Sequence, residues 1–262
     1  MRLRDGSPAT GPGRDAPTEH AEDPRLRGLA EPQHHGRAAE ALLPGSLEDA
    51  RIAVDPTERF SFLSHGVGAL AACAGLVLLV LRADGAREVV AATIYAASLV
   101  VLLASSALHH AIHPASPAGA RTLRRMDHVA IFLLIAGTYT PATLLGLRGA
   151  WGWSLFGVIW GLAAAGVALK VLWLHAPRWL STLVYVLMGW TVMVAFPVAW
   201  RAFGPTGFLL VLAGGVAYTA GAVVYARQRP DPWPGWLGFH GLWHVAVLVG
   251  AALHFAFVWR LL

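Results

Sequence analysis

Residues 237–259 read LGFHGLWHVAVLVGAALHFAFVW, and this stretch determines how the rest of the chain is interpreted. It is apolar and reaches the length of about 20 residues that a helix needs to cross about 30 Å of hydrocarbon. Two histidines, His240 and His244, stand four residues apart near its start. Side chains at positions i and i+4 share one helix face, so two imidazoles at this spacing can reach one metal ion. The stretch therefore predicts a membrane helix that carries part of a metal site.

The composition of the whole chain favours an integral membrane protein. Of its 262 residues, 56% are hydrophobic and only 13% are charged, whereas about 25% are charged in an average soluble protein. The net charge is +5, but the cations of the second part of the chain stand in short segments between apolar runs. Orientation in a membrane explains this pattern better than nucleic-acid binding does. The single cysteine, Cys73, excludes an intrachain disulfide and a Cys-rich zinc site.

The first part of the chain differs in composition from the rest. Residues 1–55 are rich in Gly, Pro, Ala, Arg and acidic residues and have no sustained apolar period. Such a segment cannot bury enough apolar surface to fold. We expect a disordered cytoplasmic tail over 1–55 and a membrane domain over 56–262.

The membrane domain contains seven apolar runs, each near the length of one membrane crossing. They cover residues 60–81, 89–112, 127–147, 151–174, 179–200, 206–226 and 237–259. Charged or turn-forming residues separate them, and the third and fourth runs abut so closely that a tight turn at Arg148-Gly149 is required. The sequence predicts an all-α integral membrane protein with a seven-transmembrane-helix bundle.

The distribution of basic residues predicts the orientation of this bundle. One set of helix ends carries Arg51, Arg59, Arg121, Arg124, Arg125, Lys170, Arg178, Arg227 and Arg229, and the other carries Arg82, Arg87, Arg148, Arg201 and Arg260. Lys and Arg are in excess on the cytoplasmic side of bacterial membrane proteins. We therefore expect a multi-pass protein of the cell membrane with its N-terminus in the cytoplasm and its C-terminus outside.

Polar residues that are costly inside a bilayer gather at one end of the predicted bundle. The second run ends, and the first, third and seventh runs begin, on the same side of the membrane. The residues placed there are Ser106, His110, Asp127, His240 and His244, with His65 of the first run as a further candidate. Asp127, at the predicted start of the third run, could also be a helix N-terminal acid or the partner of Arg124 or Arg125. His254 would lie about 15 Å deeper than His244, which indicates packing or cavity lining.

This combination of residues suits zinc chemistry. Neutral imidazoles bind Zn²⁺, and three protein ligands leave a fourth position for water in catalytic zinc sites. A nearby carboxylate can orient that water or act as a general base, and a serine can donate a hydrogen bond to a developing oxyanion. A hydrogen-bonded network of His, Asp and Ser that tightens the bundle is the alternative interpretation.

Three segments resemble the hemolysin III family of bacterial membrane proteins, within the larger group that contains the adiponectin and progestin receptors. They are Ser105–His110 (SSALHH), Arg125–Pro141 (RMDHVAIFLLIAGTYTP) and His240–His244 (HGLWH), with a weaker fourth at Ser64–Ala69 (SHGVGA). Together they span about residues 58–258, and the segment that runs from the aspartate to Thr-Tyr-Thr-Pro is the most specific.

The resemblance implies seven helices and a cytoplasmic-side zinc ion held by three histidines. On the matching positions these are His110, His240 and His244, with Asp127 near the metal-bound water and Ser106 beside it. Glu58 resembles an acid that the family carries ahead of its first helix. His109 departs from the pattern, because we expect tyrosine there, and it leaves open which of His109 and His110 binds the metal.

Three functions are consistent with these features. The receptor relatives and the similar alkaline ceramidases suggest a zinc-dependent hydrolase that acts on a lipid amide or ester, with membrane lipids as partners and no nucleic acid. The family name suggests a pore-forming cytolysin instead. A receptor or sensor with structural zinc is the third possibility. The sequence leaves the substrate and the oligomeric state undetermined.

Overall fold

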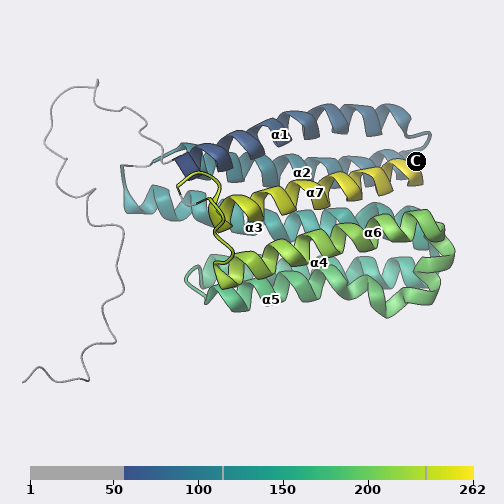
Figure 1. Ribbon diagram of the computed structural model, residues 1–262. Helices are drawn as coiled ribbons and strands as arrows, with labels where there is room; N and C mark the ends of the chain where they lie inside the picture. The colour runs from purple at the N-terminus through teal and green to yellow at the C-terminus, as the bar shows by residue number, and fades with distance from the viewer. Residues whose placement is uncertain (1–55, 114, 234) are drawn as a thin grey trace, which may run out of the picture. The chain divides into compact units, whose positions relative to one another are not determined.

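The structure, a computed structural model, describes residues 56–113, 115–233 and 235–262 (Figure 1). All regular structure in these ranges is helical. The tail that we predicted for residues 1–55 lies outside the described residues.

Seven α-helices and two short irregular helices follow one another along the described part of the chain. They are α1 (Pro56–Arg82), α2 (Ala86–Ala111), α3 (Pro117–Pro141), the π-helix η2 (Ala142–Leu147), α4 (Gly149–Leu172), α5 (Arg178–Gly189), the 3₁₀-helix η3 (Trp190–Ala195), α6 (Phe196–Arg227) and α7 (Gly238–Leu261). The predicted tight turn between the third and fourth runs is present, with positive φ angles of 51° at Arg148 and 55° at Gly149.

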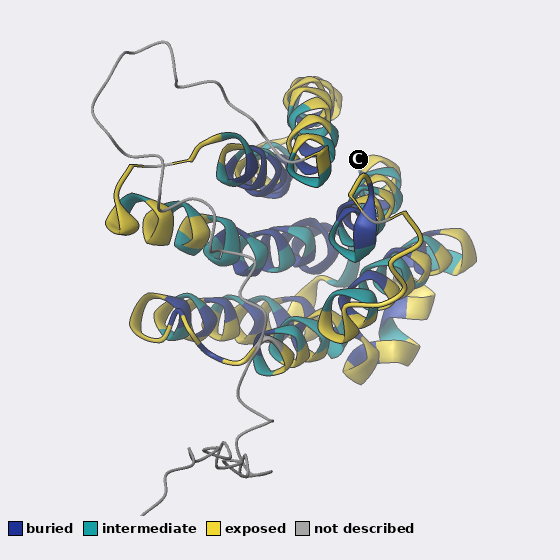
Figure 2. Cartoon of the chain, turned by 60° about the vertical axis from the view of Figure 1, so that its left-hand side comes forward, coloured by how far each residue is buried: buried dark blue, intermediate teal, exposed yellow. Residues whose placement is uncertain are grey.

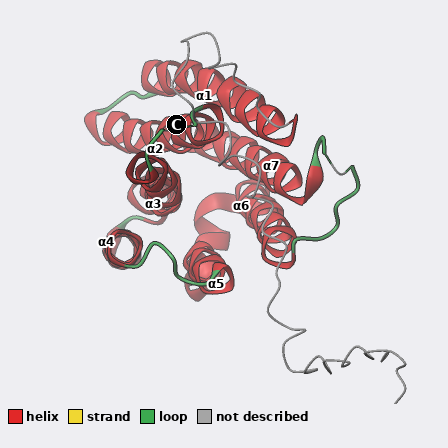
Figure 3. Cartoon of the chain, turned by 90° about the vertical axis from the view of Figure 1, so that its left-hand side faces the viewer, coloured by secondary structure: helices red, strands yellow, loops and turns green. Residues whose placement is uncertain are grey.

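The helices pack in chain order around a closed ring. Each of α1 to α7 contacts the next, directly or through η2 and η3, and α7 returns to contact α1. The end-on view shows this arrangement (Figure 3). Because successive helices alternate in direction, the start of α1, the end of α2 and the starts of α3 and α7 lie at one end of the bundle, on the left in Figure 1.

The outer surface of the ring is apolar, as lipid contact requires. Leu70 is 73% exposed and Leu172 is 85% exposed, and the exposed residues face outward along α1 and α4 (Figure 2). A soluble monomer rarely exposes large contiguous apolar patches. Among the described residues, six helical segments are long and apolar enough to cross a membrane. The chain is therefore a helical, multi-pass membrane protein.

The count of six confirms the predicted seven crossings only in part. The difference arises because residues 179–227 count as one helical segment of 49 residues, although two helices meet there at a kink at Gly204, inside our predicted boundary of 201–205. The backbone does depart from helical geometry at Gly204, with φ 67° and ψ 172°, immediately before Pro205.

The third helix begins earlier than the sequence predicted. We expected residue 127, but α3 starts at Pro117, and the Ser116 hydroxyl caps it by accepting a hydrogen bond from the Gly119 N–H at 3.1 Å. The reason is that hydropathy locates the hydrocarbon-spanning part of a helix and misses polar turns that continue beyond it. Asp127 consequently lies ten residues inside α3, so the interpretation as a helix N-terminal acid was wrong.

Candidate metal centre

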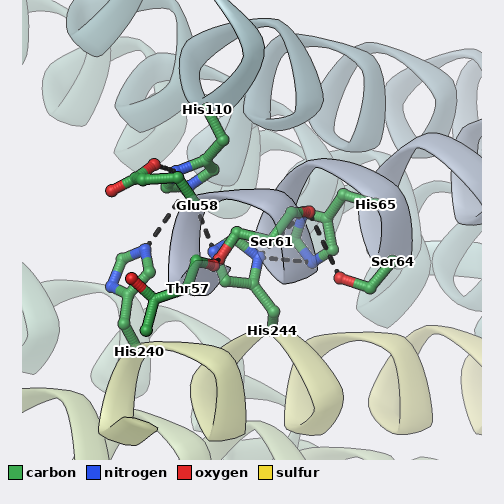
Figure 4. A network of polar contacts seen from close by, with 8 residues as sticks. All are labelled: Thr57, Glu58, Ser61, Ser64, His65, His110, His240 and His244. Carbon is green, nitrogen blue, oxygen red and sulfur yellow. Dashed lines mark hydrogen bonds and ion pairs between the residues drawn. The ribbon is translucent and has the colours of Figure 1, made fainter. Parts of the chain in front are cut away.

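Three histidines from two helices meet at the end of the bundle described above. His110 lies in the last turn of α2, and His240 and His244 lie in the first two turns of α7. The His110 Nε2 is 3.3 Å from the His240 Nε2 and 3.1 Å from the His244 Nε2. One ligand atom from each ring lies within 4.8 Å of the other two. The three rings converge in this way in Figure 4.

The chemistry of these nitrogen atoms fits a metal ion. In tetrahedral zinc sites the Zn–N distance is about 2.0–2.1 Å, so two bound imidazole nitrogens are separated by about 3.3 Å. The two Nε2–Nε2 distances from His110 are close to this value. His110 and His244 are also buried, where lone pairs that face one another without a cation or a proton between them are costly. The donor set is consistent with zinc but does not identify the metal.

Glu58 of α1 fixes the orientation of the His110 ring. A Glu58 carboxylate oxygen lies 2.5 Å from the His110 Nδ1. When Nδ1–H donates to this carboxylate, the lone pair of Nε2 is left to face the other two histidines. Metal-binding histidines commonly donate their second ring N–H to a carboxylate in this way. Glu58 thus orients a candidate ligand and does not itself belong to the candidate group.

His65 of α1 contacts His244 in a similar position. The His65 Nε2 lies 2.8 Å from the His244 Nδ1, and both side chains are 2% exposed. His65 can accept the Nδ1–H of His244 and leave its Nε2 directed toward His110 (Figure 4). Sequence reasoning placed His65 at this end but missed its role. The signal was present, because Glu58 and His65 stand seven residues apart and therefore lie on one face of α1.

The other two histidines that we considered lie outside the cluster. The ring of His109 lies 5.1 Å from that of His110 between centroids, but the group that can hold a metal contains His110. The structure therefore favours His110 as the ligand of this pair. His254 contacts the Val211 carbonyl oxygen at 3.2 Å and lines a cavity, in agreement with the role expected for it.

A cavity of about 160 Å³ adjoins the histidine cluster. Its lining is mainly apolar and includes residues of α3, α5, α6 and α7. Along α7 the cavity extends from His240 and His244 to the deeper His254. Ser106 and Asp127 also line it. An apolar cavity with a few convergent polar groups is the usual form of a small-molecule site.

Ser106 and Asp127 lie together on this cavity, as the sequence predicted for one end of the bundle. Ser106 is buried, and its hydroxyl lies close enough to the Asp127 carboxylate to interact with it electrostatically. Within the described residues Asp127 forms no ion pair with Arg124 or Arg125, which was the alternative interpretation. Asp127 does not belong to the group close enough to share a metal. The functional roles of Ser106 and Asp127 remain predictions.

Comparisons with known proteins agree with the resemblance. Residues 55–255 match a family model described as Haemolysin-III related. The chain is 39% identical to Hemolysin-3 of Bacillus cereus over 197 residues, which is 74% of this chain and 86% of the relative. It is 35% identical to the Hemolysin-3 homolog of Bacillus subtilis (strain 168) over 197 residues, 74% of this chain and 88% of that protein. Monocyte to macrophage differentiation factor of Homo sapiens is 25% identical over 203 residues, 76% and 82% of the two chains. The chain belongs to the haemolysin III-related family.

Proposed function

We propose that this protein is a zinc-dependent hydrolase that cleaves an amide or ester bond of a membrane lipid. The observation that carries the proposal is that three convergent imidazoles adjoin a largely apolar cavity that Ser106 and Asp127 also line. A purely structural zinc site is usually closed by four protein ligands, whereas a catalytic site keeps an open position. Here three histidines form the group, and the carboxylate that adjoins the cavity lies outside it.

In this proposal His110, His240 and His244 hold the metal. A bound Zn²⁺ supplies Lewis-acid activation of water and of a carbonyl oxygen. Asp127 accepts a proton from the attacking water and returns it to the leaving amine or alcohol as the carbonyl carbon–heteroatom bond breaks. Ser106 has a single O–H, which can either orient the Asp127 carboxylate or donate a hydrogen bond to charge that develops on the carbonyl oxygen.

The proposal includes seven membrane crossings, with the site at the cytoplasmic end. A straight helix of 49 residues would be about 73 Å long, more than twice the hydrocarbon thickness of about 30 Å. The positive φ at Gly204 supports a reversal there, so that residues 179–227 cross twice. The basic residues near the starts of α1 and α3 support a cytoplasmic N-terminus. The lipid head would then reach the histidines while its chains stay in hydrocarbon.

Metal analysis followed by a lipid-hydrolysis screen tests the proposal. Purified wild type should contain about one zinc per chain, and His240→Ala and His110→Ala should lose most of it. Asp127→Asn should keep the zinc and lose turnover of any lipid amide or ester that the wild type cleaves. Wild type without zinc would refute the proposal. Full metal occupancy with no turnover across ceramides, N-acyl amines and glycerolipids would favour a receptor or sensor with structural zinc.

A second function is suggested by the names of two relatives, Hemolysin-3 and Hemolysin-3 homolog. A pore-forming cytolysin would release a trapped dye from liposomes, and the leak would persist in His240→Ala because a pore does not require the metal. A hydrolase would release dye only from liposomes that contain its substrate, and His240→Ala would abolish that release. The same two proteins therefore discriminate between the functions.

A further inference from the structure

The lining of the cavity includes a buried lysine that has no acidic partner. Lys170, in the last turn of α4, is 2% exposed. Its Nζ donates to the Ser181 Oγ at 2.5 Å, and no carboxylate of the described residues lies within ion-pair distance of it. An ammonium group has three N–H donors, and a buried charge is costly unless it is paired. Lys170 therefore retains unused capacity to bind an anion.

Two residues of α3 add to this capacity on the same cavity. Arg124 and His128 stand at i and i+4, so they share a face of α3, and both line the cavity with Lys170. The His128 Nδ1 is buried and has no hydrogen-bond partner, although the Tyr185 hydroxyl donates to the His128 backbone carbonyl at 3.2 Å and helps to hold the residue in place. The three side chains thus offer donors that the described protein does not satisfy.

The electrostatic balance of the cavity also favours an anion. Of the described residues that line it, Asp127 alone is acidic, whereas Arg124 and Lys170 are basic. Among the described residues Asp127 forms an ion pair with neither cation. Charged groups inside a membrane commonly mark the pathway or binding site of a substrate.

We propose that Arg124, His128 and Lys170 form a subsite for an anionic group, a phosphate or a carboxylate, on an amphiphile whose acyl chain occupies the apolar part of the cavity. The starts of α3 and α7 and the end of α4 lie at the same end of the bundle, so the subsite and the three histidines share one membrane level. Arginine binds phosphate and carboxylate in bidentate geometry, and lysine binds them as a point charge. The inference rests on the proposed lipid hydrolase in one respect, because it restricts the substrates of that enzyme to lipids with an anionic head group.

Equilibrium binding of matched lipids to the purified full chain in a neutral detergent tests this subsite. The probes are 1-oleoylglycerol 3-phosphate, oleate, 1-oleoylglycerol and inorganic phosphate. The two anionic lipids should bind at least tenfold more tightly than 1-oleoylglycerol, which has the same chain without the charge. Displacement of the phospholipid by inorganic phosphate at comparable concentration would identify free phosphate as the ligand and overturn the amphiphile assignment.

Variants locate the subsite. Lys170→Met keeps an apolar chain of similar length in the buried position, and Arg124→Gln changes an exposed residue, so its fold is not at risk. Each should weaken binding of the anionic lipids about tenfold and leave 1-oleoylglycerol unaffected. Arg201→Gln, an exposed cation of α6, is the matched control and should bind as wild type does. Wild-type affinity in both cavity variants, or equal affinity of wild type for charged and neutral lipids, would refute the subsite.

The same samples separate this inference from the proposed enzymatic function. His240→Ala should lose its metal and keep its preference for anionic lipids. If wild type holds zinc and cleaves lipids but shows no such preference, the subsite fails and the hydrolase stands. If the preference is present in a protein without zinc, the hydrolase fails and the subsite stands.

Discussion

Replacement of Glu58 by glutamine should weaken zinc binding although Glu58 is not a ligand. Its carboxylate accepts from the His110 Nδ1 at 2.5 Å and so fixes the tautomer that presents Nε2 to the metal. Loss of such an outer contact costs about 10- to 100-fold in metal affinity. The Glu58 side chain is 41% exposed, and solvent can replace part of its effect. We therefore expect a loss near the lower limit, about tenfold, or about 1.4 kcal/mol.

Competition with a chromophoric zinc chelator measures this change. Wild type, Glu58→Gln and the control Asp84→Asn, an exposed acid in the turn between the end of α1 and the start of α2, are titrated in the same detergent. The control should match wild type, because Asp84 is remote from the histidines. A zinc affinity of Glu58→Gln within twofold of wild type would show that a neutral acceptor, the glutamine amide oxygen or water, orients His110 as well as the carboxylate does, and would refute the role assigned to the Glu58 charge.

Three further predictions concern neighbouring residues. His65→Ala should weaken zinc affinity more than Glu58→Gln does, toward 100-fold by the same chelator titration, because this buried contact with His244 cannot be replaced easily by water. His109→Ala should leave the zinc content unchanged in metal analysis, since His109 lies outside the ligand group. Gly137→Ala should destabilise the protein by about 1–3 kcal/mol in a denaturation experiment, because a Cβ there would lie 2.0 Å from the Ser98 hydroxyl oxygen on α2.

Much of the fold could be predicted because membrane helices have a simple requirement. Each must present about 20 apolar residues, and the starts and ends of six segments follow from that pattern within a few residues, apart from the start of α3. The polar turns from Pro117 to Asp127 give no hydropathy signal, yet they form helix, and Ser116 caps their first turn. Hydropathy also could not define the backbone at Gly204, where a local φ angle decides the path.

The gathering of site residues at one end could be predicted from topology alone, since alternating helices place alternate ends together. The side-chain contacts that these residues make with one another could not be predicted in this way. The rotation of α1 about its axis determines that Glu58 faces His110 and that His65 faces His244. The sequence constrains this rotation weakly, because α1 is apolar on most of its surface. The pairing of Lys170 with Ser181 depends in the same way on how α4 and α5 meet.

The arrangement of α1 connects the metal centre to the stability of the bundle. The candidate ligands come from α2 and α7, and α1 packs against both helices while holding one ligand of each through Glu58 and His65. A metal ion that binds only the folded arrangement stabilises it by mass action, by about 2.7 kcal/mol at a free concentration 100 times the dissociation constant. Metal binding would therefore tighten the contacts among all three helices, whatever chemistry occurs in the adjoining cavity. Stabilisation by zinc alone is thus compatible with both a structural and a catalytic site, and the function of Asp127 is what separates the two.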